Sequence, residues 1–173
     1  MKFLTYAASL LCIVNTTCFA ANIISVVDSQ SCKQMRGTDK QFILALKKGE
    51  EVTRSILKCV NDANLPGASF SGLGALENPT LDFYSVAMKK FQGKTFDGVF
   101  ELISLNGTIS SAESKRGMNI HVALGDSEYH VIGGHLDNAL VGVKADITIT
   151  PFKGKVAKKF DDKIGVSFLT AGA

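Results

Sequence analysis

The chain has 173 residues, of which 46% are hydrophobic and 20% charged, and its formal net charge is +3 at pH 7. This length suits one domain with a buried core. A charge so close to neutral excludes a broad electrostatic footprint for nucleic acid. Beyond the first twenty residues no apolar run is long enough to cross a bilayer.

Residues 1–20 have the pattern of a signal peptide. Lys2 supplies the positive end, residues 3–14 are mostly apolar but too short to span a bilayer, and small residues precede position 21. We therefore expect a mature chain that begins near Ala21. The protein is expected to be exported, either to the periplasm or outside the cell.

The remaining chain divides into three parts by pattern. Residues 21–40 are polar and weakly patterned, which predicts an N-terminal extension. The folded domain is expected over residues 41–152. Residues 153–173 are expected to complete or flank that domain.

The first elements of the domain are a strand over residues 41–46 and a helix over residues 50–64. Apolar residues in the second segment recur at spacings of three and four, which builds one buried stripe along a helix. The stripe consists of Val52, Ile56, Cys59, Val60 and Ala63.

Further along, the sequence predicts mainly strands. They are expected over residues 68–75, 80–88, 95–110 and 139–150, with Gly93 and Gly107 at turns or bulges. In the last of these segments apolar and polar residues alternate, so that five apolar side chains are expected on one face. Those residues are Val141, Val143, Ala145, Ile147 and Ile149. The fold class is therefore α+β, with a sheet packed on one principal helix.

Two cysteines remain after the leader, Cys32 and Cys59. An exported chain meets an oxidising compartment, where such a pair can close a disulfide. Cys59 also lies on the apolar face of the predicted helix, where a buried free thiol is equally natural. Both interpretations fit the sequence.

A hairpin is predicted from residues 118–124 and 129–136, which flank a natural turn at residues 125–128. In the first strand Asn119 and His121 lie on the face opposite to the apolar residues. When the apolar faces of the two strands are matched, His135 joins them, because directly opposed residues share a side of the sheet.

The expected register pairs Asn119 with His135 and sets Gly133 beside His121. His130 would then point to the other side. Neutral imidazoles are good zinc ligands, so His121 and His135 are candidate metal ligands. Two histidines and an amide are one ligand short of the usual catalytic set, and a hydrogen-bonded polar cluster at a subunit interface fits the same spacing.

Two further features bear on chemistry. Gly133 and Gly134 would form a bulge that lets a ligand or neighbouring subunit approach, or a bend needed for sheet curvature. Glu101 lies in an apolar strand, where an unpaired carboxylate is costly to bury. It would either partner a histidine, and then act as a catalytic acid or base, or face water.

Several motifs occur in the order typical of the plants-and-prokaryotes-conserved (PPC) domain family, and the resemblance runs over residues 41–152. The motifs are GEE at 49–51, SGLGA at 71–75, FELISLNGTI at 100–109 and VIGGHL at 131–136. The resemblance implies a mainly antiparallel, strongly curved sheet with a packed helix, assembled as a homotrimer.

The resemblance also bears on metal and DNA. The wider superfamily resembles acetolactate decarboxylase, whose zinc is held by a His-x-His pair and a later histidine. Here His121 and His135 match that pattern, whereas Asn119 occupies the first position. In plants the domain accompanies AT-hook DNA-binding motifs, but this chain has no Arg-Gly-Arg-Pro element.

Three functions follow. The first is a homotrimeric exported module that binds a small molecule or protein partner at Asn119, His121, Gly133, Gly134 and His135, without established catalysis. The sequence has no Gly-x-Ser-x-Gly or phosphate-loop motif. The second is a zinc-dependent lyase or hydrolase that uses the two histidines. The third, DNA binding, rests on family association alone, which does not transfer function.

Overall fold

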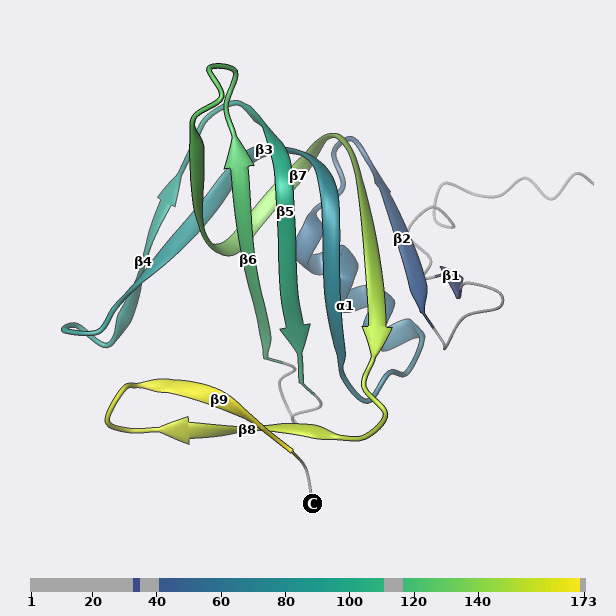
Figure 1. Ribbon diagram of the computed structural model, residues 1–173, viewed down its shortest axis with the longest axis vertical. Coiled ribbons are helices and arrows are strands. Elements are labelled where there is room, and N and C mark those ends of the chain that lie inside the picture. The colour runs from purple at the N-terminus through teal and green to yellow at the C-terminus, as the bar shows by residue number, and fades with distance from the viewer. Residues whose placement is uncertain (1–32, 35–40, 111–116, 172–173) are drawn as a thin grey trace, which may run out of the picture.

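The computed structural model describes residues 33–34, 41–110 and 117–171 (Figure 1). The predicted leader and Cys32 lie outside these residues. The elements in chain order are β1 (Lys33–Gln34), β2 (Phe42–Lys47), α1 (Val52–Asp62), β3 (Ala68–Ser85), β4 (Lys90–Thr95), β5 (Val99–Ile109), β6 (Met118–Gly125), β7 (Val131–Pro151), β8 (Val156–Asp161) and β9 (Val166–Ala171). Within the described ranges no helix has the length and apolar character needed to cross a lipid bilayer.

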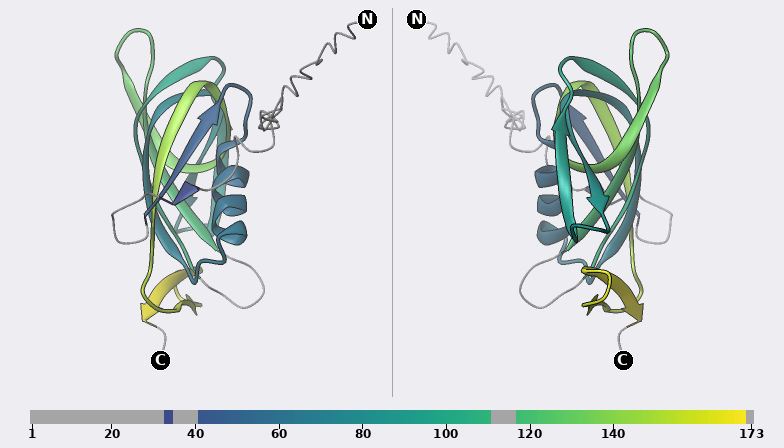
Figure 2. Two further views of the ribbon diagram at one scale, coloured as in Figure 1. Left: turned by 90° about the vertical axis from the view of Figure 1, so that its right-hand side faces the viewer. Right: turned by 90° about the vertical axis from the view of Figure 1, so that its left-hand side faces the viewer.

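An antiparallel sheet dominates the structure, and the expected α+β class is confirmed. Its strand order is β1-β2-β7-β6-β5-β3-β4, and β3 and β7 also pair with each other. Strands β3, β5, β6 and β7 therefore form a closed ring of pairings. Helix α1 covers one face of the sheet, as Figure 2 shows. We call the face away from α1 the outer face.

Helix α1 is short, with 11 residues, and it lies within the predicted helix. It begins where the Glu51 side chain accepts hydrogen bonds from the backbone N–H groups of Thr53 and Arg54, the arrangement of an N-cap. The expected apolar stripe is confirmed, since four of its members are fully buried and Ala63 is partly buried.

The core fills the space between α1 and the sheet. Fully burying one aliphatic side chain stabilises a fold by about 1.5–3 kcal/mol, so these contacts carry most of the stability. The largest fully buried side chains are Leu44, Val52, Ile56, Val60, Leu76, Leu102, Leu105, Ile109, Ile120, Leu124, Ile147 and Ile149.

Cys59 is fully buried on α1 and is disulfide-bonded. Cys32, the partner expected from the sequence, precedes β1, which pairs with β2. Because Cys32 lies outside the described residues, the Cys32–Cys59 pairing stays a prediction.

Three strand predictions were wrong, and the first concerns β7, which runs unbroken over Val131–Pro151 although separate strands were expected over 129–136 and 139–150. Strand β3 is continuous over 18 residues, although a break was expected before Thr80. The register shift between Glu77 and Thr80 accommodates Pro79 inside it. Strand β4 was missed because all its side chains are exposed, so it has no apolar alternation. Gly93 and Gly107 lie inside strands and pair with neighbours, rather than forming turns.

The alternating face of β7 was also predicted imperfectly. Val141, Ala145, Ile147 and Ile149 are buried as expected, but Val143 is 64% exposed. The pairing of β7 with β3 shifts register between Gly74 and Leu76. This irregularity turns Val143 to the outer face. The alternating sequence of β7 alone does not reveal the shift, because it depends on the pairing with β3.

The C-terminal segment folds as a separate hairpin of β8 and β9. It lies across one end of the sheet, below β4, β5 and β6 in Figure 1. Tyr84 Oη donates a hydrogen bond of 2.7 Å to the carbonyl of Ile164, and Lys89 Nζ donates one of 2.9 Å to the carbonyl of Asp162. These two bonds attach the turn of the hairpin to the β3–β4 region.

Candidate ligand-binding site

The two candidate histidines meet on neighbouring strands. His121 on β6 pairs with His135 on β7 and, on its other side, with Asn106 on β5. The two imidazole rings lie with centroids 5.4 Å apart and are nearly perpendicular. His121 is exposed and His135 is half-buried.

The predicted register of this hairpin was wrong by two residues. Asn119 pairs with Thr108 on β5 and does not oppose His135. A shift of two leaves every side chain on its original face, because the period of a strand is two. The histidine pair therefore forms as a direct cross-strand pair, and Asn119 lies one pleat repeat further along β6.

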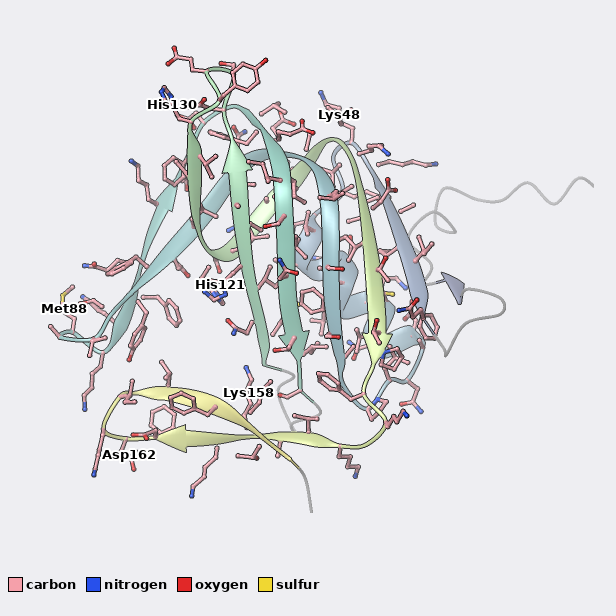
Figure 3. All side chains as sticks on the ribbon, viewed as in Figure 1. Lys48, Met88, His121, His130, Lys158 and Asp162 are labelled. Atoms are coloured by element: carbon pink, nitrogen blue, oxygen red, sulfur yellow. The ribbon has the colours of Figure 1, made fainter. Side chains whose placement is uncertain are left out.

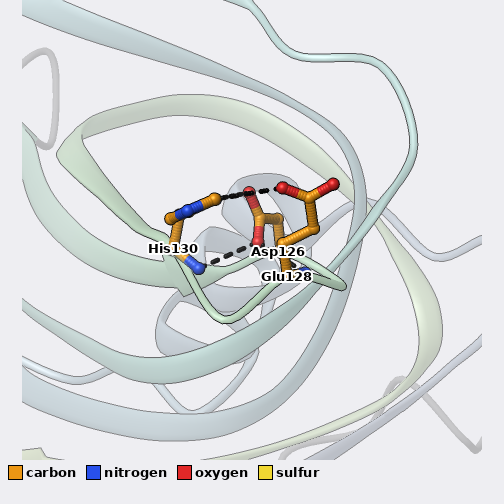
Figure 4. Close-up of polar contacts among 3 residues, drawn as sticks. All are labelled: Asp126, Glu128 and His130. Carbon is orange, nitrogen blue, oxygen red and sulfur yellow. Dashed lines mark hydrogen bonds and ion pairs between the residues drawn. The ribbon is translucent and has the colours of Figure 1, made fainter.

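The turn between β6 and β7 explains the shift. Asp126 Oδ1 accepts hydrogen bonds from the backbone N–H groups of Glu128, at 2.8 Å, and His130, at 2.9 Å. The turn thus takes in His130, whose Nδ1 lies 3.3 Å from Asp126 Oδ2 and 3.6 Å from Glu128 Oε2 (Figure 4). The backbone bond from His130 chiefly lowers the pKa of Asp126. His130 is exposed and belongs to the turn.

A polar groove of about 440 Å³ runs over the outer face beside His121. Its polar residues stand in two rows across the strands β7, β3, β5 and β6, as the pairing register shows. One row is Thr150, Ser69, Thr108 and Asn119; the other is Thr148, Ser71, Asn106 and His121. Hydroxyl and amide groups, with one imidazole, therefore offer many neutral donors and acceptors.

Most of these groove residues were not singled out from the sequence. Ser69 and Ser71 lie on β3, whereas Asn106 and Thr108 lie on β5. The two residues of each pair alternate along the strand with residues of the opposite face. This alternation could have predicted that each pair faces the outer side of the sheet. Nothing in either segment alone indicates that the two pairs lie side by side with Asn119.

Gly133 and Gly134 permit close approach of backbones within the sheet. A Cβ on Gly133 would lie 2.8 Å from the carbonyl oxygen of Val122, and one on Gly134 would lie 3.2 Å from the carbonyl oxygen of Asp82. Neither glycine lines the groove. The structure therefore gives them a role in packing β7 against its neighbours.

Glu101 lies away from the histidines. It pairs with Gly125 at the far end of β6 and is exposed to water. It precedes Asn106 by five positions on β5, which is roughly 17 Å along a strand. That separation places its carboxylate beyond hydrogen-bonding reach of His121, so a catalytic partnership between the two is not formed in the monomer.

The donor set does not complete a metal centre in one chain. His121 and His135 supply two imidazoles, and structural or catalytic zinc sites use at least three protein ligands. Within the parts of the chain that the structure describes, no group of three or more His, Cys, Asp or Glu side chains could hold a metal ion.

The surroundings of His135 disfavour its charged form. Its ring lies 5.2 Å from that of Phe91, which in turn contacts Tyr84. Burial chiefly lowers the pKa of His135 below its usual 6.5, and the charge of His121 acts in the same direction. Asp82 and Asp137 oppose this effect, whereas Lys158 adds to it.

This lowered pKa predicts a pH dependence of stability. Between pH 6.5 and the lower folded pKa, the unfolded chain binds more protons at His135, so the free energy of unfolding should fall on acidification. Urea unfolding at pH 8 and pH 5 should show a smaller loss in His135→Gln than in the parent. An equal loss in both proteins would show that His135 does not contribute.

Solved structures of other proteins share the fold of this chain. A protein from Bacteroides thetaiotaomicron, named as a candidate DNA-binding protein, is 20% identical with a TM-score of 0.75 and covers 80% of this chain and 96% of its own. A plant- and prokaryote-conserved protein from Pyrococcus horikoshii is 25% identical, with a TM-score of 0.69, and covers 82% of this chain and 96% of its own.

A third solved structure is a metal-containing protein from Archaeoglobus fulgidus. It is 27% identical, with a TM-score of 0.71, and covers 80% of this chain and 99% of its own. A comparison with curated proteins finds no match. The Plants and Prokaryotes Conserved (PCC) domain family matches residues 33–153. The chain therefore belongs to the Plants and Prokaryotes Conserved domain family, whose fold was expected from its motifs.

Proposed function

We propose that the protein is an exported homotrimeric module that binds a small molecule or a protein partner in the polar groove, without catalysis of its own. The observation that carries the proposal is the groove itself. Its two rows of hydroxyl, amide and imidazole groups can orient a ligand, whereas its lining contains no carboxylate, lysine or arginine.

The groove is poorly arranged for nucleophilic catalysis. The hydroxyl of Ser71 and the imidazole of His121 belong to the same row but are two strands apart. Neighbouring strands are about 4.8 Å apart, so this separation is roughly 10 Å. A serine activated by a base needs direct hydrogen-bonding contact, at about 2.6–3.2 Å.

Assembly is supported by an apolar area on the same outer face. Val143 is 64% exposed and lines one hollow with Val99, Ile103 and Tyr129, and Leu73, 62% exposed, lines the adjoining hollow, which shares Glu101 with the first. A contiguous exposed apolar patch marks an interaction surface in a soluble protein. We assign this patch, defined by these five apolar residues, to contact with neighbouring copies in a closed ring of three.

The test of this assembly is the mass of the purified mature protein in solution. Light scattering coupled to size-exclusion chromatography should give three times the mass of one chain. A monomer at micromolar concentration would contradict the trimer. The export component rests on the leader at residues 1–20, and N-terminal sequencing of the processed protein should begin near Ala21.

A zinc-dependent lyase or hydrolase is the second candidate. The direct pairing of His121 with His135 favours it, as does the likeness to a metal-containing protein. A copy in the trimer would have to supply the missing ligand. Zinc at one equivalent per chain in the purified parent would favour the zinc-dependent enzyme over the binding module without catalysis.

Restoring the His-x-His spacing should create zinc binding. In Asn119→His two imidazoles would stand at alternate positions on one face of β6, with His135 directly opposite His121 on β7. Three imidazoles are enough for a zinc site. Isothermal titration should show about one zinc per chain in the variant and much weaker binding in the parent. Asn138→His, an exposed position elsewhere on β7, is the control and should bind as the parent does. Equal affinity in parent and Asn119→His would contradict the expectation.

DNA binding, the third hypothesis, is supported by the names of solved structures that are 20% and 24% identical, which show the fold alone. Lysine and arginine supply the charge neutralisation that dominates affinity for duplex DNA, and the groove lining contains neither.

A further inference from the structure

The C-terminal hairpin brings a cation, Lys158, beside Gly117, two residues before the groove residue Asn119 on β6. The family match ends at residue 153, so β8 and β9 follow the part of the chain that the family defines. The bonds from Tyr84 and Lys89 attach the turn of this hairpin to the β3–β4 region. The side chains of β8 therefore have a defined position relative to the sheet.

Lys158 is a half-buried residue of β8 whose side chain lies beside the start of β6. Its side chain rises from β8 towards the sheet in Figure 3, which also labels His121 above it. A Cβ on Gly117 would lie 2.7 Å from Lys158 Nζ and 3.1 Å from both Cδ and Cε. Because Gly117 has no side chain, the side chain of Lys158 can occupy this space. Asn119, which lines the groove, stands on β6 two residues after Gly117.

The ammonium group has no acidic partner in the described parts of the chain. No hydrogen bond or ion pair of Lys158 is formed with those residues, although the side chain is half-buried. Burial lowers the pKa of Lys158. A desolvated cation is costly unless an anion or hydrogen-bond acceptor compensates it. This position therefore favours a negatively charged group.

The positive charge of Lys158 is one of the smaller causes of the lowered pKa of His135. Such a cation repels a metal ion at the histidine pair, because like charges in a partly desolvated site destabilise each other. Asp82 pairs with His135 from β3 and Asp137 follows on β7; they act on His135 in the opposite direction. Neither carboxylate forms an ion pair with Lys158.

We propose that Lys158 binds the anionic end of a small ligand, a carboxylate or phosphate group, at the end of the groove formed by Asn119 and His121. The ammonium supplies the charge, and the Asn119 amide and a His121 ring N–H supply neutral donors. The neutral remainder of the groove then accommodates the uncharged part of the ligand. This inference rests on the proposed function, since it needs the groove to be a binding site.

Titration of the purified mature protein with inorganic phosphate and, separately, with acetate tests the proposal. Backbone amide shifts of Gly117, Asn119 and His121 should change saturably with at least one anion, which also identifies the preferred class. In Lys158→Met, which keeps the length of the stem, the affinity should fall about tenfold or more, as expected for a charge-assisted contact. Lys159→Met, the exposed neighbour on β8, should bind as the parent does.

The remaining outcomes separate this proposal from the proposed function. Saturable shifts that Lys158→Met leaves unchanged would overturn the role of Lys158 while retaining the groove as a binding site. Shifts that sodium chloride reproduces at equal ionic strength would overturn the anion site as well. The trimer is tested independently by the mass of each variant, and a monomeric parent would sink the proposed assembly without bearing on the lysine.

Discussion

Replacing Gly74 with alanine should lower the free energy of unfolding by about 3 kcal/mol, because the new methyl group meets the backbone of the neighbouring strand. Its Cβ would lie 2.3 Å from the carbonyl oxygen of Lys144 and 2.6 Å from Cα of Ala145. Backbone atoms of β7 cannot rotate away as a side chain would. Gly74 also has φ +155°, in the region where an L side chain is strained.

The location of Gly74 makes the effect larger than for an ordinary strand glycine. It lies at the register shifts of β3 against both β5 and β7, where the ring of strands is bent. A loss of this size corresponds to a fall in Tm of roughly 6–12 °C for a domain of about 150 residues. Urea and thermal unfolding of parent and variant measure it directly.

Gly154→Ala is the matched control. It makes the same chemical change at a position with no heavy atom within 4 Å of the new Cβ. Its free energy of unfolding should stay within about 0.5 kcal/mol of the parent, as for most surface substitutions. If Gly74→Ala were as stable as this control, β3 and β7 would not approach as the structure has them.

The second large effect concerns assembly. Val143→Asp should convert the proposed trimer into monomers, because it places a charge within the apolar patch assigned to contact between copies. Burial of an unpaired carboxylate at an interface costs several kcal/mol, enough to dissociate a closed ring at micromolar concentration. The fold should survive, since Val143 is 64% exposed in the single chain. The mass in light scattering should fall about threefold.

Val86→Asp controls for the charge itself. Val86 is 67% exposed in the turn between β3 and β4, outside the assigned patch. The same substitution there should leave the mass and the circular dichroism spectrum unchanged. A Val143→Asp protein that keeps the parent mass would show that this patch is not the contact between copies. A variant that unfolds would be replaced by Val143→Thr, which should weaken assembly in proportion to the lost apolar area.

Local patterns predicted the elements that are half-buried. The helical stripe around Ile56 and Cys59 follows from a period of 3.6, and the faces of β6 follow from a period of 2. Both periods arise from backbone geometry, so they can be read without knowledge of the neighbours. The same reasoning fails for β4, whose exposed side chains have no buried face to reveal.

In the hairpin of the candidate site, alternation along the strands predicts the face of each side chain but not the register of the two strands. The face of His121 and His135 was predicted correctly although the register was wrong by two, because an even shift keeps each side chain on its side. The register itself depends on the Asp126 carboxylate, which draws two further backbone amides into the turn. These hydrogen bonds form only in the folded turn, so the alternation of the strands does not predict them.

By itself, the amino-acid sequence determined the α+β class, the buried face of α1, the face shared by the two histidines, and membership of the family through its ordered motifs. Only the tertiary structure decided that His121 opposes His135, that Glu101 lies far from both, and that strands distant in the chain build the groove. It also placed Lys158 beside the start of β6. The physical reason is that periodicity encodes which face a residue occupies, whereas strand pairing and register depend on contacts between segments far apart in sequence.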